Sequence, residues 1–205
     1  MALKNLQTHR VSVHAMYYTI ARERAARYHE CDAEYSKLED GPIGEEELSQ
    51  VSHRMEDYYE ERERSAVVAI TFAGMALEAF FYDYGAEHLG DKFVREHLDK
   101  LDLKSKFLIY PRLICGKSPD KSKAAYQSLG NLVSLPNDLV HFKSKAFPLE
   151  ELDKASDFHV VLNKGLKVGV DDAMKCVMHV MSELDSIHGS GSGFALRMHW
   201  SLGSV

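Results

Sequence analysis

Apolar residues recur at helical spacing along most of the chain, and no segment alternates between apolar and polar residues as a half-buried strand does. Residues 3–39 contain no proline or glycine and show this spacing, which predicts a first helix. The sequence Asp-Gly-Pro-Ile-Gly at 40–44 then predicts a turn. The apolar stripe of the first helix consists of Val13, Tyr17, Ile20 and Ala21.

A second, long helix is predicted at 45–88. Its first half is amphipathic, whereas residues 66–84 are apolar nearly all round, which predicts a central place in the fold. The longest apolar run, Ser65–Leu77, has 13 residues before Glu78 interrupts it. A membrane span needs about 20 residues, so we interpret this run as part of a buried core helix. Gly74 within the run predicts the close approach of another helix.

Shorter helical patterns fill the rest of the chain. Pro136 is expected to interrupt one of them or to start a new turn, and a turn is predicted at 164–169. The Gly/Ser-rich segment 188–193 predicts a hinge, and 189–205 a flexible tail that is disordered or docked on a partner. Residues 1–188 are therefore predicted to form a single all-α domain, a helical bundle. The shorter helices are predicted at 91–101, 103–114, 121–135, 137–143, 150–163 and 171–188.

The composition indicates a cytoplasmic protein without disulfide bonds. The 205 residues are 45% hydrophobic and 27% charged, which is typical of one globular domain. The three cysteines include no CxxC pair, and the N-terminus lacks an apolar signal segment. No HExxH, paired Glu-x-x-His, GxGxxG or Walker motif is present. We therefore predict no metal site, no cofactor and no membrane association.

Charge is distributed unevenly along the chain, although the net charge of −6 argues against general binding of polyanions. Residues 30–63 hold 13 acidic residues and three basic ones, whereas residues 100–145 hold nine basic residues and three acidic ones. Either both stretches are ordinary solvated surfaces, or the basic stretch forms an anion-binding surface. The candidate binding cations are Lys104, Lys106, Arg112, Lys143 and Lys145.

Three stretches within about 65–147 together resemble the HEPN family, whose members are all-α dimeric domains that often act as metal-independent ribonucleases. The resemblance implies a HEPN-like core at 65–147, a helical N-terminal extension at 1–64 and additional C-terminal helices. It also implies a homodimer. The stretches are Ala73–Phe81 with its embedded acid, Leu101–Phe107 followed by a short helix and Gly116-Lys117, and Leu135–Lys143.

The motif of the family is an arginine, usually followed by a polar residue such as asparagine, and then a histidine after a few residues. Asn137 and His141 match this pattern and lie four residues apart, on one face of a helix, whereas Pro136 stands at the arginine position. An imidazole can transfer protons near neutral pH, but proline cannot hold a phosphate as arginine does. By resemblance, Glu78 lies near this cleft, and we expect it to pair with His141 or with a lysine. Asp138 is predicted to line the binding surface.

The leading interpretation is a catalytically degenerate HEPN-like protein that binds RNA, a nucleotide or a cognate partner protein. Toxin–antitoxin and phage-defence systems are the context that the resemblance implies. Two alternatives stay open. In the first alternative, the protein is an active metal-independent endoribonuclease in which another cation replaces the arginine. In the second, it is a structural or protein-interaction module without a nucleic-acid role. The candidate replacement cations are Lys143, Lys145, Arg112 and Lys106.

Overall fold

The computed structural model describes residues 12–41, 48–140, 152–189 and 193–194, and within these ranges all regular secondary structure is helical. The predicted all-α helical bundle is thereby confirmed. Its elements are α1 (His14–Asp40), α2 (Leu48–Leu89), α3 (Asp91–Phe93), the short π-helix η1 (Val94–Leu98), α4 (Leu103–Cys115), α5 (Ala124–Val140) and α6 (Leu152–His188).

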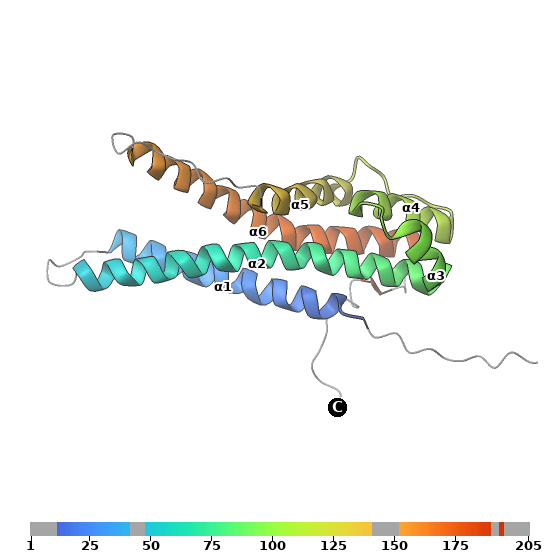
Figure 1. The fold of residues 1–205 in the computed structure, drawn as a ribbon, viewed down its shortest axis with the longest axis horizontal. Helices are drawn as coiled ribbons and strands as arrows, with labels where there is room; N and C mark the ends of the chain where they lie inside the picture. Colours follow the sequence, from blue (N-terminus) through green and yellow to red (C-terminus); the bar gives the residue numbers. More distant parts are fainter. Residues whose placement is uncertain (1–11, 42–47, 141–151, 190–192, 195–205) are drawn as a thin grey trace, which may run out of the picture.

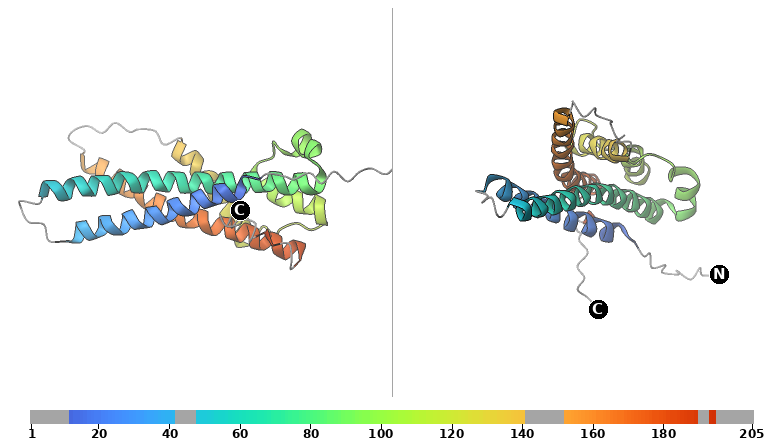
Figure 2. Two further views of the ribbon diagram at one scale, coloured as in Figure 1. Left: turned by 90° about the horizontal axis from the view of Figure 1, so that it is seen from below. Right: turned by 60° about the vertical axis from the view of Figure 1, so that its left-hand side comes forward.

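The bundle is arranged around α2. The helices α1 and α2 form a long antiparallel hairpin, and α6 and α5 lie across the other side of α2 (Figures 1 and 2). The short elements α3 and η1 and the helix α4 gather at the end where α2 terminates (Figure 1). Because α1 runs antiparallel to α2, the beginning of α1 lies beside the last third of α2. The helix α4 also packs on α2, and these two helices carry the candidate site residues whose side chains the structure describes.

The core explains why the second half of α2 is apolar nearly all round. Its inner positions are buried against α1, α4, α5 and α6, which confirms the predicted central place. The helix is also long and apolar enough to cross a membrane, a criterion that core helices of bundles meet as well; half of its most apolar window is buried. The buried residues of α2 include Ala66, Ala69, Ile70, Ala73, Ala76, Leu77, Phe80, Phe81 and Tyr84.

Two predicted interruptions are wrong. The turn expected at 164–169 is absent, because α6 continues through Gly165 and Gly169. A glycine costs a helix about 1 kcal/mol, and the burial of Leu166 and Val170 in the core offsets that cost. Likewise α5 continues through Pro136 to Val140, although proline lacks the amide hydrogen that a residue inside a helix donates.

The close approach predicted at Gly74 occurs at another glycine. A Cβ atom added to Gly74 would meet nothing within 4 Å among the described residues, so this position faces open space. At Gly85, by contrast, an added Cβ would lie 2.6 Å from Cε2 of Tyr110 and 3.2 Å from Cγ2 of Val94. Gly85 therefore allows α4 and η1 to pack directly on the backbone of α2.

Candidate functional site

The structure describes only part of the predicted site. His141, Lys143 and Lys145 lie outside the described residues, and the backbone of Asn137 and Asp138 belongs to the last turn of α5 while their side chains lie outside the description. The remaining four residues are described. Glu78 comes from α2, and Lys104, Lys106 and Arg112 come from α4.

The first turn of α4 is fixed by a side-chain cap. The carboxylate of Asp102 accepts hydrogen bonds from the backbone N–H of Ser105 at 3.0 Å and from its hydroxyl at 2.6 Å. These bonds hold the pKa of Asp102 below its usual value, the side-chain bond contributing most. The cap sets the direction in which the next residues of α4 project, and Lys104 and Lys106 lie in this turn.

Glu78 and Lys106 form an ion pair between α2 and α4. Nζ of Lys106 donates to Oε2 of Glu78 at 2.5 Å, so the partner of Glu78 is a lysine, one of the two expected partners. The side chain of Lys106 is only 5% exposed, whereas that of Glu78 is 46% exposed. Because a buried ammonium group needs a partner, the pair ties α4 to α2 and leaves the carboxylate at the surface.

A second cluster, between α4 and α5, combines two lysines with an aromatic ring. Nζ of Lys104 lies 4.7 Å from the ring centroid of Tyr126, and Nζ of Lys121 lies 5.9 Å from it. Gly130, one turn beyond Tyr126, makes room for this arrangement, because an added Cβ would lie 3.3 Å from Nζ of Lys104. The basic stretch and Tyr126 are visible in the sequence, but the contact between α4 and α5 is not.

The acidic residues near this cluster are engaged elsewhere. Asp120 accepts from the backbone N–H and the hydroxyl of Ser122, both at 2.8 Å, and these bonds lower its pKa. Glu183 of α6 pairs with Lys123 at 2.8 Å. Among the described residues, neither Lys104 nor Lys121 pairs with a carboxylate. The cluster of Lys104, Lys121 and Tyr126, called the α4–α5 surface below, therefore keeps a local positive charge.

Arg112 lies apart from the α4–α5 surface. It is exposed in the last turn of α4, and Gly116, the residue that follows this helix, has a left-handed φ of 75°. Eight residues separate it from Lys104, which corresponds to roughly 12 Å along the helix axis. The structure thus separates the predicted cations: Lys104 lies beside Tyr126, Lys106 is buried in an ion pair, and Arg112 lies at the far end of α4.

Sequence reasoning also missed a group of Ser12, His14 and Asp83. Nδ1 of His14 lies 3.2 Å from Oδ2 of Asp83, and the hydroxyl of Ser12 contacts both groups. A nucleophilic triad requires serine and aspartate on different ring nitrogens of the histidine, but here both contact Nδ1. The group therefore fixes the beginning of α1 against α2 and is not arranged as a nucleophile. Within the described residues, no cluster of three or more His, Cys, Asp or Glu side chains could hold a metal ion.

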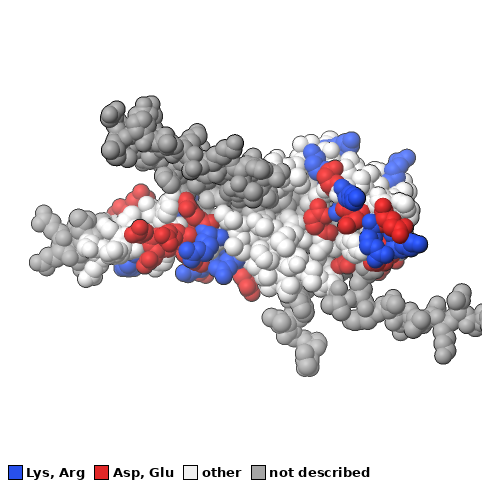
Figure 3. Space-filling model, viewed as in Figure 1, with Lys and Arg blue, Asp and Glu red and all other residues white. Residues whose placement is uncertain are grey.

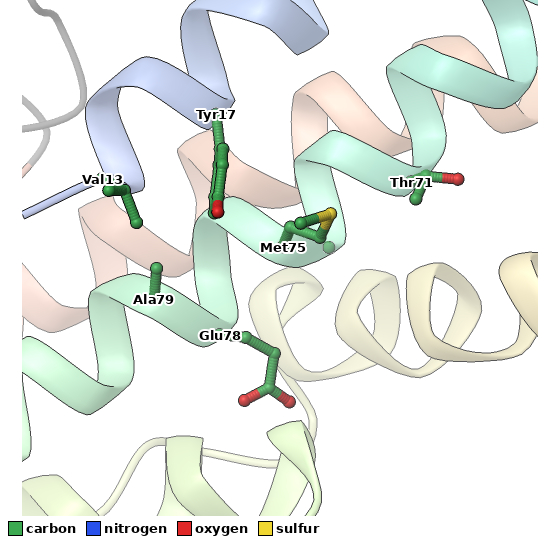
Figure 4. Close-up of a pocket in the computed structure, with 7 residues that line it drawn as sticks. Val13, Tyr17, Thr71, Met75, Glu78 and Ala79 are labelled. Carbon is green, nitrogen blue, oxygen red and sulfur yellow. The ribbon is translucent and has the colours of Figure 1, made fainter.

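An open apolar hollow of about 540 Å³ lies between the beginning of α1 and the middle of α2 (Figure 4). The wall on the α1 side is formed by Val13, which directly precedes the helix, and by Tyr17. Glu78 stands at the edge of the hollow, with its carboxylate pointing away from Tyr17 (Figure 4). This hollow, called the α1–α2 groove below, adjoins the Glu78–Lys106 pair. The residues of α2 that line it are Thr71, Gly74, Met75, Glu78 and Ala79.

No protein-family model matches this chain, and neither a curated protein nor a solved structure is detectably similar to it. The resemblance to HEPN domains therefore stays a prediction that rests on the residues quoted for it.

Proposed function

We propose that the protein binds single-stranded RNA through the α4–α5 surface and does not cleave it, as a catalytically degenerate, homodimeric HEPN-like protein. The observation that carries the proposal is the placement of Lys104 and Lys121 beside the ring of Tyr126, without carboxylate partners among the described residues. Single-stranded nucleic acids are bound by such combinations, because a base stacks on an aromatic ring while cations contact the backbone phosphates. A toxin–antitoxin or phage-defence role is implied by the family resemblance.

The register of α5 connects this surface with the predicted HEPN motif. Position 137 is 11 residues after Tyr126, which at 3.6 residues per turn returns it to within about 20° of the same helix face. The rise along α5 between the two positions is roughly 16 Å, the reach of a few nucleotides. An RNA strand that begins at Tyr126 and follows α5 would thus approach position 137, the asparagine of the predicted motif.

Two features argue that bound RNA is not cleaved. Pro136 replaces the arginine of the motif, and loss of one such electrostatic donor typically costs on the order of 100-fold or more in rate. Lys106, one of the candidate substitutes, is buried and paired with Glu78, so it could reach a phosphate only by leaving that ion pair. The active endoribonuclease is therefore the less favoured alternative.

Binding is tested by fluorescence anisotropy with a labelled single-stranded RNA in EDTA. We expect Lys104→Glu and Tyr126→Ala to weaken binding at least several-fold, whereas Lys175→Glu, which makes the same charge change at an exposed position of α6, should leave it nearly unchanged. The affinity should fall as salt rises, and less steeply for Lys104→Glu. Equal affinities of wild type, Lys104→Glu and Tyr126→Ala would refute this site, and no RNA binding at all would favour the interaction module.

Catalysis is tested separately by incubating the pure protein with RNA in EDTA. We expect no cleavage by the wild type and a gain of cleavage in Pro136→Arg. Cleavage by the wild type that His141→Ala abolishes would establish the active alternative. Sedimentation of the full chain tests the homodimer, and a mass that stays monomeric at high protein concentration would contradict it. Lys143→Glu should weaken RNA binding if the surface extends beyond α5.

A further inference from the structure

One face of α2, which includes the floor of the α1–α2 groove, carries apolar side chains that the described helices leave exposed. Val67 and Met75 lie about two turns apart on this face and are 41% and 39% exposed. Beside Met75, a Cβ atom added to Gly74 would meet nothing within 4 Å among the described residues. Figure 3 shows an uncharged band across the middle of the molecule, between two charged ends, where α1 and α2 pass. A contiguous apolar surface of this kind is typical of an interaction site.

The two ends of this face carry opposite charges that have room for another partner. The side chain of Arg64 is 66% exposed, and its carboxylate partners, at 3.5 and 3.7 Å, are glutamates one turn earlier on the same helix. At the other end, Oε2 of Glu78 binds Lys106, while the second carboxylate oxygen has no hydrogen-bond partner among the described residues. Arg64 and Glu78 of one chain cannot meet, because 14 residues, or roughly 21 Å of helix, separate them.

This face of α2 is complementary to itself about Thr71. At 3.6 residues per turn, positions 64, 67, 71, 75 and 78 all lie within about 40° of one direction. In a two-fold interface, each residue of one copy faces the same counterpart on the other copy. If the axis passes through Thr71 of two antiparallel helices, positions equally far before and after it face each other. A second copy then supplies a carboxylate for each exposed cation and an apolar side chain for each apolar position. The facing pairs are Arg64 with Glu78, Val67 with Met75, and Val68 with the open space at Gly74.

We propose that two copies of the chain pair through this face of α2, antiparallel to each other and with the two-fold axis at Thr71. The apolar side chains of each copy enter the α1–α2 groove of the other. Arg64 of each copy binds the carboxylate oxygen of Glu78 that Lys106 leaves unused, so the ion pair forms twice. This inference rests on the homodimer of the proposed function, for which it names the contacting residues. It does not depend on RNA binding, because the α4–α5 surface plays no part in it.

The ion pairs are tested by sedimentation of the full chain over a range of protein concentrations. Arg64→Glu places like charges beside each other at both ends of the interface, so we expect it to raise the dissociation constant of the dimer at least tenfold. Arg95→Glu is the matched control and should leave the dissociation constant unchanged. Its side chain is 63% exposed against 66% for Arg64, and each arginine pairs with an acid one turn earlier.

The register is tested by cysteine crosslinking, which does not depend on charge. In a Cys115→Ser background the two remaining native thiols are buried. Copies with Val67→Cys, mixed with copies with Met75→Cys, should form an intermolecular disulfide under a mild oxidant, as seen on a non-reducing gel. Either variant alone should form far less, because its two thiols would lie eight residues, or roughly 12 Å, apart along the helices, beyond the reach of a disulfide.

The outcomes separate this interface from the rest of the proposed function. A wild type that stays monomeric at high protein concentration would overturn the interface together with the homodimer. A stable dimer for which Arg64→Glu and Arg95→Glu give equal dissociation constants, or in which the mixed disulfide does not form, would overturn the interface and leave the homodimer standing. RNA binding through the α4–α5 surface is measured separately by anisotropy.

Discussion

The Glu78–Lys106 pair predicts an asymmetry between its two partners. Removing one partner of a fully buried ion pair costs about 3–5 kcal/mol, because a buried charge is left alone. Here only the ammonium group is buried, whereas the carboxylate is half exposed and can be hydrated. We therefore expect Glu78→Gln to lower the free energy of unfolding by about 1–2 kcal/mol, since it strands the cation and keeps only a neutral acceptor. Lys106→Met should cost less than about 1 kcal/mol, because methionine preserves the apolar stem and the carboxylate left behind is solvated.

The asymmetry is measured by urea unfolding of wild type, both single variants and the double variant, followed by far-UV circular dichroism. The double variant should have nearly the same free energy of unfolding as Lys106→Met, because without the lysine the carboxylate has no buried cation to neutralise. The reasoning is refuted if Lys106→Met is the more destabilising change, or if the two single effects simply add. A larger effect of Lys106→Met would mean that the carboxylate depends on its partner more than the ammonium group does, and additive effects would mean that the pair contributes as little as an ordinary surface salt bridge.

Three further predictions concern packing, titration and thiol chemistry. Gly85→Ala should lower the free energy of unfolding by about 1–3 kcal/mol, because the new Cβ would lie 2.6 Å from a tyrosine ring of α4. Gly165→Ala, at an open position of α6, should instead raise the free energy of unfolding by about 0.4–1 kcal/mol. Urea titrations that give the same sign for both variants would contradict this packing. Burial raises the pKa of Asp32, but the hydrogen bond and charge of a lysine of α6 and an arginine of α2 outweigh it and lower the pKa overall. A carboxylate whose pKa is lower in the folded state than in the unfolded state, near about 4, stabilises the fold above that pH, and this contribution is lost as the pH falls. Asp32→Asn should therefore reduce the loss of unfolding free energy between about pH 5 and 3. The same dependence on pH in wild type and variant would refute the ion pairs. Cys115 is half-buried and should react with a thiol reagent in the folded protein. Burial raises the pKa of Cys176 to about 11, so this thiol should react only after unfolding. The number of reacted thiols is measured by absorbance with and without urea.

The helical periodicity of the sequence was enough to predict the class of fold and the central helix. The continuous apolar run around Ala73 has no polar face that could meet water, so it belongs inside a bundle whatever its neighbours are. The break at 164–169 was wrongly predicted, because the cost of glycines in a helix competes with the burial of Leu166 and Val170; the break expected at Pro136 is absent as well. Burial depends on the partner helices, which the local sequence does not specify.

The candidate site divides in the same way. The sequence was sufficient to predict that Glu78 needs a partner, because an acid in an apolar helix is costly to bury alone. It left both His141 and the lysines as candidate partners of Glu78, and the packing of α4 on α2 selected Lys106 among the described residues. The contact of Lys104 with Tyr126 had no local signal, because the two residues lie 22 positions apart and meet only where α4 crosses α5.

The composition and the helical spacing of apolar residues determined which segments are helical and which charged groups require a partner. These properties follow from single residues and their nearest neighbours along the chain. The tertiary structure alone decided that Gly85 and not Gly74 is the close contact, that Lys106 is buried while Lys104 meets an aromatic ring, and that Phe194 belongs to the core. The physical reason is that helix packing brings together side chains far apart in sequence, and the energy of each contact depends on distance and burial that no local pattern encodes.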